Sequence, residues 1–280
     1  MLSSFVITLR EGLEAALIVG LVLASLKRAE ALRLVRSVWI GVGAAVGVSL
    51  AAGAGFALTA GALPDRFGEI FEGVASLVAV GVLTFMIFWM RSQSRHLARD
   101  INDKVALAAG LGSGWALGVL AFAAVVREGL ETVLFLYASF TASDALSATV
   151  GAVLGLLIAV ALGWGIYAGS LTLDLRRFFF ATGALLIVFA AGLLAYGLHE
   201  LGEANVVPML VEHVWDMNGV LDEEGTLGSL LKGLLGYNGN PSLLEVIAYW
   251  TYLLVVGSLF MGLPHRTRLA DRPQEPVTQS

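Results

Sequence analysis

Long runs of apolar residues with few polar interruptions dominate this chain. The runs are continuously apolar rather than alternating, so they predict helices and not barrel strands. A helix needs about 20 mostly apolar residues to cross a bilayer. The seven windows that reach this length are Phe5–Leu26, Val38–Leu58, Ile70–Met90, Val105–Tyr137, Ala148–Leu171, Phe178–Leu198 and Leu243–Met261. The pattern predicts an all-α membrane protein with seven transmembrane helices, the fourth window being broken near its glycine-rich part, Gly110–Gly114.

The polar residues between the windows indicate how the chain is oriented. Basic residues gather in alternate connections, at 27–36, 91–104 and 176–177, and again at 266–272 after the last window. Acidic residues gather in the other connections. Because basic loops stay on the cytoplasmic side, we expect the N-terminus outside and the C-terminus in the cytoplasm. The first apolar run has no basic segment before it, so we expect a retained helix rather than a signal peptide.

One five-residue sequence, Arg-Glu-Gly-Leu-Glu, occurs twice, at Arg10–Glu14 and Arg127–Glu131. The two copies lie in the first and fourth windows, which cross the membrane in opposite directions. This arrangement predicts a 3+3 inverted repeat with one additional C-terminal helix. We expect a single integral membrane domain, 1–270, made of repeat one (1–104), repeat two (105–203), an outer loop (204–242) and helix seven (243–263), followed by a disordered cytoplasmic tail (271–280).

The spacing within each motif places its two glutamates on one helix face. Residues three or four apart on a helix are neighbours, so both carboxylates can reach one cation and the arginine can reach the second glutamate. Four glutamates and two arginines, if all are ionised, give the site a net charge of −2. Carboxylates suit hard or borderline cations. The motifs therefore predict a metal-cation site with charge-balancing arginines, formed by Glu11, Glu14, Glu128, Glu131, Arg10 and Arg127.

Composition strengthens this interpretation. Hydrophobic residues make up 58% of the 280 residues and charged residues only 14%, with a mean hydropathy of +0.83. Charge inside hydrocarbon is costly, which makes repeated intramembrane charges candidates for a function. The alternative is an arginine–glutamate pair that only cross-links helices, although two copies in opposite orientation favour a site. The chain has no cysteine, which excludes thiolate metal sites and disulfides, and nothing in it suggests nucleic-acid binding.

Two further Glu-x-x-Glu pairs lie near the outer ends of the third and sixth windows. They are Glu69 with Glu72, and Glu200 with Glu203. We expect them to act as an outer vestibule that collects metal cations, although acidic residues at solvated helix ends need no function. His199, next to the second pair, is expected to be an interfacial hydrogen-bonding residue rather than a ligand.

At these motifs the chain resembles the high-affinity iron permeases of the oxidase-dependent iron transporter type, including the bacterial EfeU-like ferrous/ferric iron permeases. The resemblance rests on the two intact Arg-Glu-x-x-Glu motifs and extends through Phe71–Met90 and Leu230–Tyr252. It implies iron import across the bacterial cytoplasmic (inner) membrane, with the four motif glutamates as iron ligands and the two motif arginines balancing their charge.

The resemblance also implies that iron is a transported substrate and not a permanently bound cofactor. It implies ferric iron delivered by periplasmic or extracytoplasmic oxidising or delivering proteins, with membrane lipid as the other partner, and it implies no enzyme activity. Three alternatives stay open: a permease for other divalent metals such as lead, an intramembrane di-iron oxidoreductase, and a membrane scaffold without transport. Di-iron bundles use Glu-x-x-His pairs, which this chain lacks.

Overall fold

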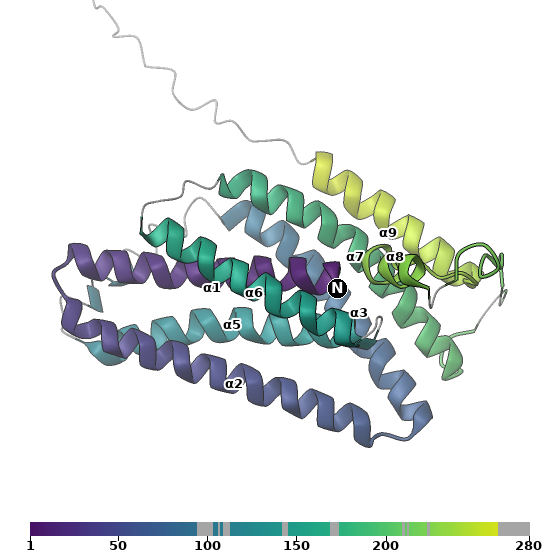
Figure 1. Ribbon diagram of the computed structural model, residues 1–280, viewed down its shortest axis with the longest axis horizontal. Coiled ribbons are helices and arrows are strands. Elements are labelled where there is room, and N and C mark those ends of the chain that lie inside the picture. The colour runs from purple at the N-terminus through teal and green to yellow at the C-terminus, as the bar shows by residue number, and fades with distance from the viewer. Residues whose placement is uncertain are drawn as a thin grey trace, which may run out of the picture.

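The computed structural model describes residues 1–93, 103–105, 107–108, 113–141, 145–168, 174–208, 211, 213–222 and 225–262, and their regular structure is entirely helical (Figure 1). The elements are α1 (Leu2–Arg28), the short 3-10 helix η1 (Leu32–Leu34), α2 (Val35–Ala62), α3 (Asp65–Gln93), α5 (Gly114–Thr141), α6 (Ala145–Tyr167), α7 (Leu175–Glu203), α8 (Thr226–Leu235) and α9 (Leu243–Gly262). The predicted tail, 271–280, lies outside the described residues.

Five of the described helices are long and apolar enough to cross a bilayer by length and composition. They occupy Leu32–Ala62, Asp65–Met90, Ala145–Tyr167, Arg177–Glu203 and Leu243–Gly262. The helices α1 and α5 are 27 and 28 residues long, and each carries the three charges of one motif, which lower its apolar content. The all-helical, membrane-type fold is confirmed. Each predicted window coincides with one long helix over most of its length, and the fourth does so only from Gly114, where α5 begins and the glycine-rich stretch ends.

Two parallel helix pairs surround the motifs, α1 with α6 and α5 with α2 (Figure 1). Three close contacts in the first pair recur in the second with the same spacing along each helix. The contacts between α1 and α6 are Met1 with Gly151, Gly12 with Ala159 and Ala16 with Gly163. Their counterparts between α5 and α2, in the same order, are Gly118 with Gly41, Gly129 with Ser49 and Val133 with Gly53. The structure therefore contains two copies of one helix pair. Small residues at the crossings allow the backbones to approach closely.

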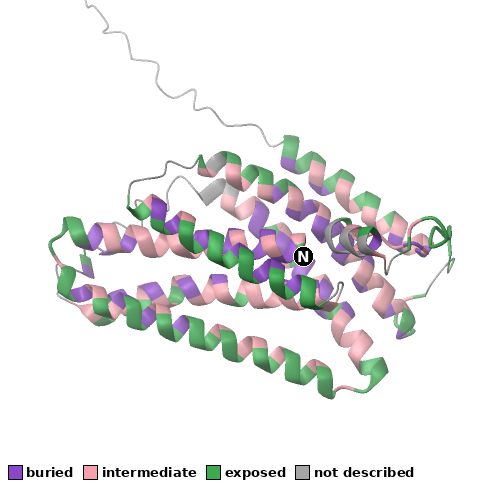
Figure 2. Cartoon of the chain, viewed as in Figure 1, coloured by how far each residue is buried: buried purple, intermediate pink, exposed green. Residues whose placement is uncertain are grey.

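The helices α1 and α5 meet antiparallel between these pairs. The hydroxyls of Ser4 and Ser139 are 2.9 Å apart at one end of the contact. At the other end Val22 and Ala121 belong to one buried cluster. A larger buried cluster joins residues of α1, α3, α5, α7 and α9. Buried positions line the inside of the bundle, whereas α2 turns mostly exposed apolar residues outward, as a lipid-facing helix requires (Figure 2).

The helices α3 and α7 form a third, antiparallel pair. Gly73 lies against Gly197, and Ile87 lies against Gly183. When α3 and α7 exchange places, Gly73 takes the position of Gly183 and Ile87 takes the position of Gly197, so each contact becomes the other. In this alignment residue 89 of α3 is equivalent to residue 199 of α7. Trp89 and Met90 thus correspond to His199 and Glu200, and the Glu-x-x-Glu pairs of α3 and α7 are not equivalent to each other. Both pairs lie at the same end of the bundle, as the sequence suggested.

The segment between α7 and α9 folds back onto the bundle. Helix α8 packs against α7 and α1, and it ends at Gly236, which has a left-handed φ of 68°. The backbones of Gly236 and Gly192 touch so closely that a Cβ on Gly192 would lie 2.6 Å from the Cα of Gly236. Glycine is therefore required at both positions, by conformation and contact at Gly236 and by contact at Gly192.

Candidate metal-cation site

Carboxylates from both motifs meet where α1 crosses α5. Ligand oxygens of Glu11, Glu128 and Glu131 all lie within 4.8 Å of one another, and no other trio of metal-ligating residues among the described residues meets this spacing. Glu11 and Glu128 are buried. Both oxygens of Glu11 and one oxygen each of Glu128 and Glu131 are buried without a hydrogen-bond partner in the described structure. Buried carboxylate oxygens are strongly disfavoured without a partner, so this arrangement fits a cation ligand set.

The two motif arginines pair with the second glutamate of their own motif, as the spacing predicts. Arg10 Nε donates to Glu14 Oε1 at 3.1 Å, and Arg127 Nε donates to Glu131 Oε1 at 3.0 Å. Arg127 Nε also lies 4.0 Å from Glu128 Oε1. Each arginine thus partly neutralises the carboxylates of its own helix.

The two motifs differ in exposure. The side chain of Arg10 is 2% exposed and that of Arg127 is 40% exposed. Glu14 is also buried and pairs with Arg10, but it does not belong to the close trio, whereas Glu131 pairs with Arg127 and still presents its second oxygen to the trio. The sequence predicted all four motif glutamates as ligands, and the structure brings three of them together.

The central glycine of each motif has a packing role that the sequence did not reveal. A Cβ on Gly12 would lie 2.9 Å from the Cβ of Ala159 in α6. The equivalent Cβ on Gly129 would lie 2.9 Å from the Cβ of Ser49 in α2 and closer still to its hydroxyl. Glycine at the middle of the motif lets a neighbouring helix cross directly behind the carboxylates.

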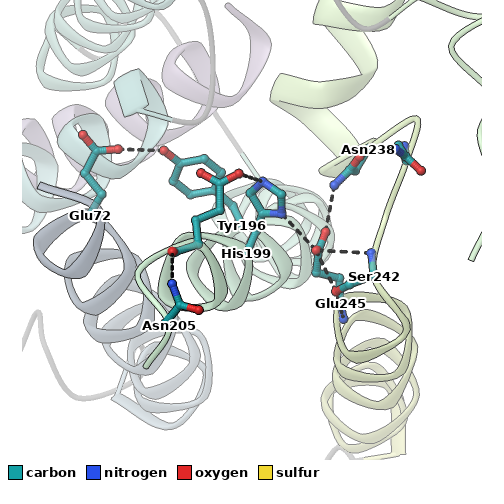
Figure 3. A network of polar contacts seen from close by, with 9 residues as sticks. Glu72, Tyr196, His199, Asn205, Asn238, Ser242 and Glu245 are labelled. Atoms are coloured by element: carbon teal, nitrogen blue, oxygen red, sulfur yellow. Dashed lines mark hydrogen bonds and ion pairs between the residues drawn. The ribbon is translucent and has the colours of Figure 1, made fainter. Parts of the chain in front are cut away.

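The predicted vestibule glutamates do not form a compact ligand set. Glu72 accepts a hydrogen bond of 2.8 Å from the hydroxyl of Tyr196, which joins α3 to α7 (Figure 3). Glu200 lies close enough to Glu72 for electrostatic interaction. Glu69 is half-buried, and its side chain makes no hydrogen bond or ion pair with the part of the chain that the structure describes. Glu203 is exposed and lies 3.4 Å from His199 Nε2.

Sequence reasoning missed Glu245, a buried carboxylate at the start of α9. Its Oε1 accepts from the Ser242 hydroxyl at 2.8 Å and lies 3.0 Å from His199 Nδ1, while its Oε2 accepts from Asn238 at 2.8 Å (Figure 3). Ser242 and Glu245 also exchange backbone-to-side-chain bonds. This is a capping box, and the Ser-x-x-Glu sequence before an apolar run is the signal that could have revealed it. His199 is confirmed as a hydrogen-bonding residue.

The model of the iron permease FTR1 family matches residues 1–266. The chain is 40% identical over 267 residues to a ferrous iron permease EfeU of Yersinia pestis, with 94% of each chain covered. It is 41% identical over 270 residues to a ferrous iron permease EfeU of Escherichia coli O157:H7, covering 96% of this chain and 98% of the relative. No solved structure matches the chain. By the extent of these matches, the chain belongs to the iron permease FTR1 family.

Proposed function

We propose that this protein imports iron across the bacterial cytoplasmic membrane and that the close trio of Glu11, Glu128 and Glu131 is the cargo site. One observation carries the proposal: four buried carboxylate oxygens of these residues have no hydrogen-bond partner in the described structure. The relatives are named ferrous iron permeases, which supports iron as the cargo. Iron is a passing substrate here, and Glu14 completes the set when Arg10 releases it.

The proposed topology has seven spans, with the N-terminus outside. It is supported by the two equivalent parallel helix pairs and by the antiparallel crossing of α1 and α5. In a 3+3 inverted repeat the substrate site lies at the interface of the repeats near the bilayer midplane. The position of both motifs in the α1–α5 crossing agrees with this rule. The outer glutamates, Glu72 and Glu200 among them, would collect iron delivered by extracytoplasmic partner proteins.

The oxidation state follows from the charge of the site. Four motif glutamates and two arginines leave −2 when ionised, which a divalent ion neutralises and a trivalent ion exceeds by one. We therefore propose that the partners deliver iron as Fe(II) and that it occupies the site in that state. Other divalent metals such as lead have the same charge and are the competing cargo.

Uptake into proteoliposomes tests the proposal. Fe(II) under reducing conditions should enter, with Fe(III) citrate and lead as separate arms. Glu11→Gln and Glu128→Gln should abolish uptake. Glu30→Gln provides the matched control, since Glu30 is exposed beyond the end of α1. Normal Fe(II) uptake by both motif variants would overturn the site assignment, and uptake of lead in preference to iron would overturn the cargo.

A further inference from the structure

Both motif arginines make a second contact, and both contacts are with adjacent residues of α3. Arg10 Nη2 donates to the Met90 sulfur at 3.1 Å. The Arg127 guanidinium lies over the Trp89 ring, 4.2 Å from its centroid. Each guanidinium therefore lies between a glutamate of its own helix and a side chain of α3.

The α3 side chains hold the arginines without adding negative charge. A thioether sulfur is a weak acceptor, and an indole ring attracts a cation through its quadrupole. Arg10 is less than fully satisfied, because its Nη1 is buried with no hydrogen-bond partner in the described structure. Its guanidinium is thus retained near Glu14 by contacts weaker than those of a second carboxylate.

This arrangement departs from the twofold pattern of the helices. The positions of α7 equivalent to Trp89 and Met90 are His199 and Glu200, so strict symmetry would give each arginine a partner in a different repeat. Instead both arginines use α3. A glutamate at the α3 position would compete with the motif glutamates for an arginine, whereas tryptophan and methionine do not.

We propose that Trp89 and Met90 are positioning residues that hold the two motif arginines while iron occupies the carboxylates. The inference rests on the proposed function. When Arg10 releases Glu14 to the cation, it loses its Nε partner, and when a cation binds the second oxygen of Glu131, the pair of Glu131 with Arg127 weakens. In both cases the contact with α3 still holds the guanidinium. Attraction to a ring or a sulfur matters more for a cation with no counter-ion than for one already paired. The contacts of the arginines with α3 therefore stabilise the iron-bound protein more than the iron-free protein. A difference of this kind raises the affinity of the site for iron.

Fe(II) uptake kinetics in proteoliposomes test this role. A cation–π contact at a partly buried site corresponds to about a fivefold change in an equilibrium constant. We expect Trp89→Leu and Met90→Leu to raise KM several-fold with little change in Vmax, and Trp89→Phe to restore most of the loss because it keeps a ring face. Phe88→Leu and Met86→Leu are matched controls, since both residues pack in the apolar cluster and should leave KM unchanged.

Double-mutant cycles on equilibrium Fe(II) binding to purified protein separate positioning from packing. The effect of Trp89→Leu should disappear in an Arg127→Gln background and persist in an Arg10→Gln background. The effect of Met90→Leu should do the reverse. Equal effects in both backgrounds, or KM changes of the same size in the Phe88 and Met86 controls, would overturn the inference.

The Glu11→Gln variant distinguishes a wrong cargo site from a wrong positioning role. If it takes up iron normally, the proposed cargo site is wrong whatever Trp89 does. If it is inactive while Trp89→Leu and Met90→Leu behave like their controls, the cargo site stands and the positioning role alone is wrong.

Discussion

Glu11 and Glu128 come from helices that run in opposite directions, yet their carboxylates belong to one group whose ligand oxygens lie within 4.8 Å of one another. The two residues hold the same place in the two motif copies. The closeness of Glu11 and Glu128 shows that α1 and α5 cross at the motifs. At this crossing some motif residues face the carboxylate trio and others pair with each other.

The two glutamates of the first motif should respond in opposite ways to neutralisation. Glu11→Gln replaces a buried carboxylate whose oxygens have no hydrogen-bond partner among the described residues, so thermal stability in detergent should stay the same or rise while Fe(II) uptake is lost. Glu14→Gln leaves the buried Arg10 without its carboxylate, and breaking one side of a buried pair costs about 3–5 kcal/mol. Thermal unfolding followed by circular dichroism measures the stability of both variants. Equal destabilisation by the two variants would contradict the pairing.

The two arginines should differ in their structural importance. Arg10→Gln leaves Glu14 buried and unpaired, and we expect a loss of several kcal/mol. The side chain of Arg127 is 40% exposed, so its pair with Glu131 is less completely buried than the pair of Arg10 with Glu14, and Arg127→Gln should cost less than Arg10→Gln. Denaturant titration of each variant gives the comparison. A larger loss for Arg127→Gln than for Arg10→Gln would contradict this order.

The motif glycines should tolerate no side chain unless the helix behind them yields. Gly129→Ala would bring its Cβ into contact with Ser49, and overpacking of this kind typically costs about 1–3 kcal/mol. Combining it with Ser49→Gly should recover much of that stability. Gly43 faces open space in the described structure, so Gly43→Ala should be neutral or stabilising by up to about 1 kcal/mol through helix propensity. Failure of Ser49→Gly to rescue would argue against a direct clash.

Glu245 has two separable roles that two substitutions distinguish. Glutamine can occupy the last position of a capping box, so Glu245→Gln should keep the α9 start while removing the charge that faces His199. Glu245→Ala should lose both and destabilise the protein by about 1–2 kcal/mol. We expect only the alanine variant to unfold at a clearly lower temperature, and thermal unfolding of both variants makes the comparison. Equal losses for Glu245→Gln and Glu245→Ala would mean that the charge facing His199, and not the capping box, stabilises this end of α9.

Much of the fold could be predicted because its signals are local. Apolar runs the length of a bilayer predict helices wherever they occur, and each of the seven windows coincides over most of its length with a long helix. The pairing of Arg10 with Glu14 follows from helical spacing alone. Predictions became incomplete where they depended on contacts between distant segments. The Glu-x-x-Glu pairs of α3 and α7 look alike in sequence, but their helices meet with residue 87 equivalent to residue 197, so the two pairs are not counterparts.

The sequence by itself determined the helices, the repeated motif and the set of charged residues that hydrocarbon would otherwise exclude, because periodicity and transfer cost act on each segment separately. Only the tertiary structure decided which carboxylate oxygens lack a hydrogen-bond partner and that a buried Arg10 holds Glu14. It also decided that the motif glycines allow a neighbouring helix to cross, that Met90 contacts Arg10 and that Trp89 contacts Arg127. These facts depend on how helices far apart in the chain pack together. Packing brings side chains into contact, and the number of residues between them does not determine their distance in space.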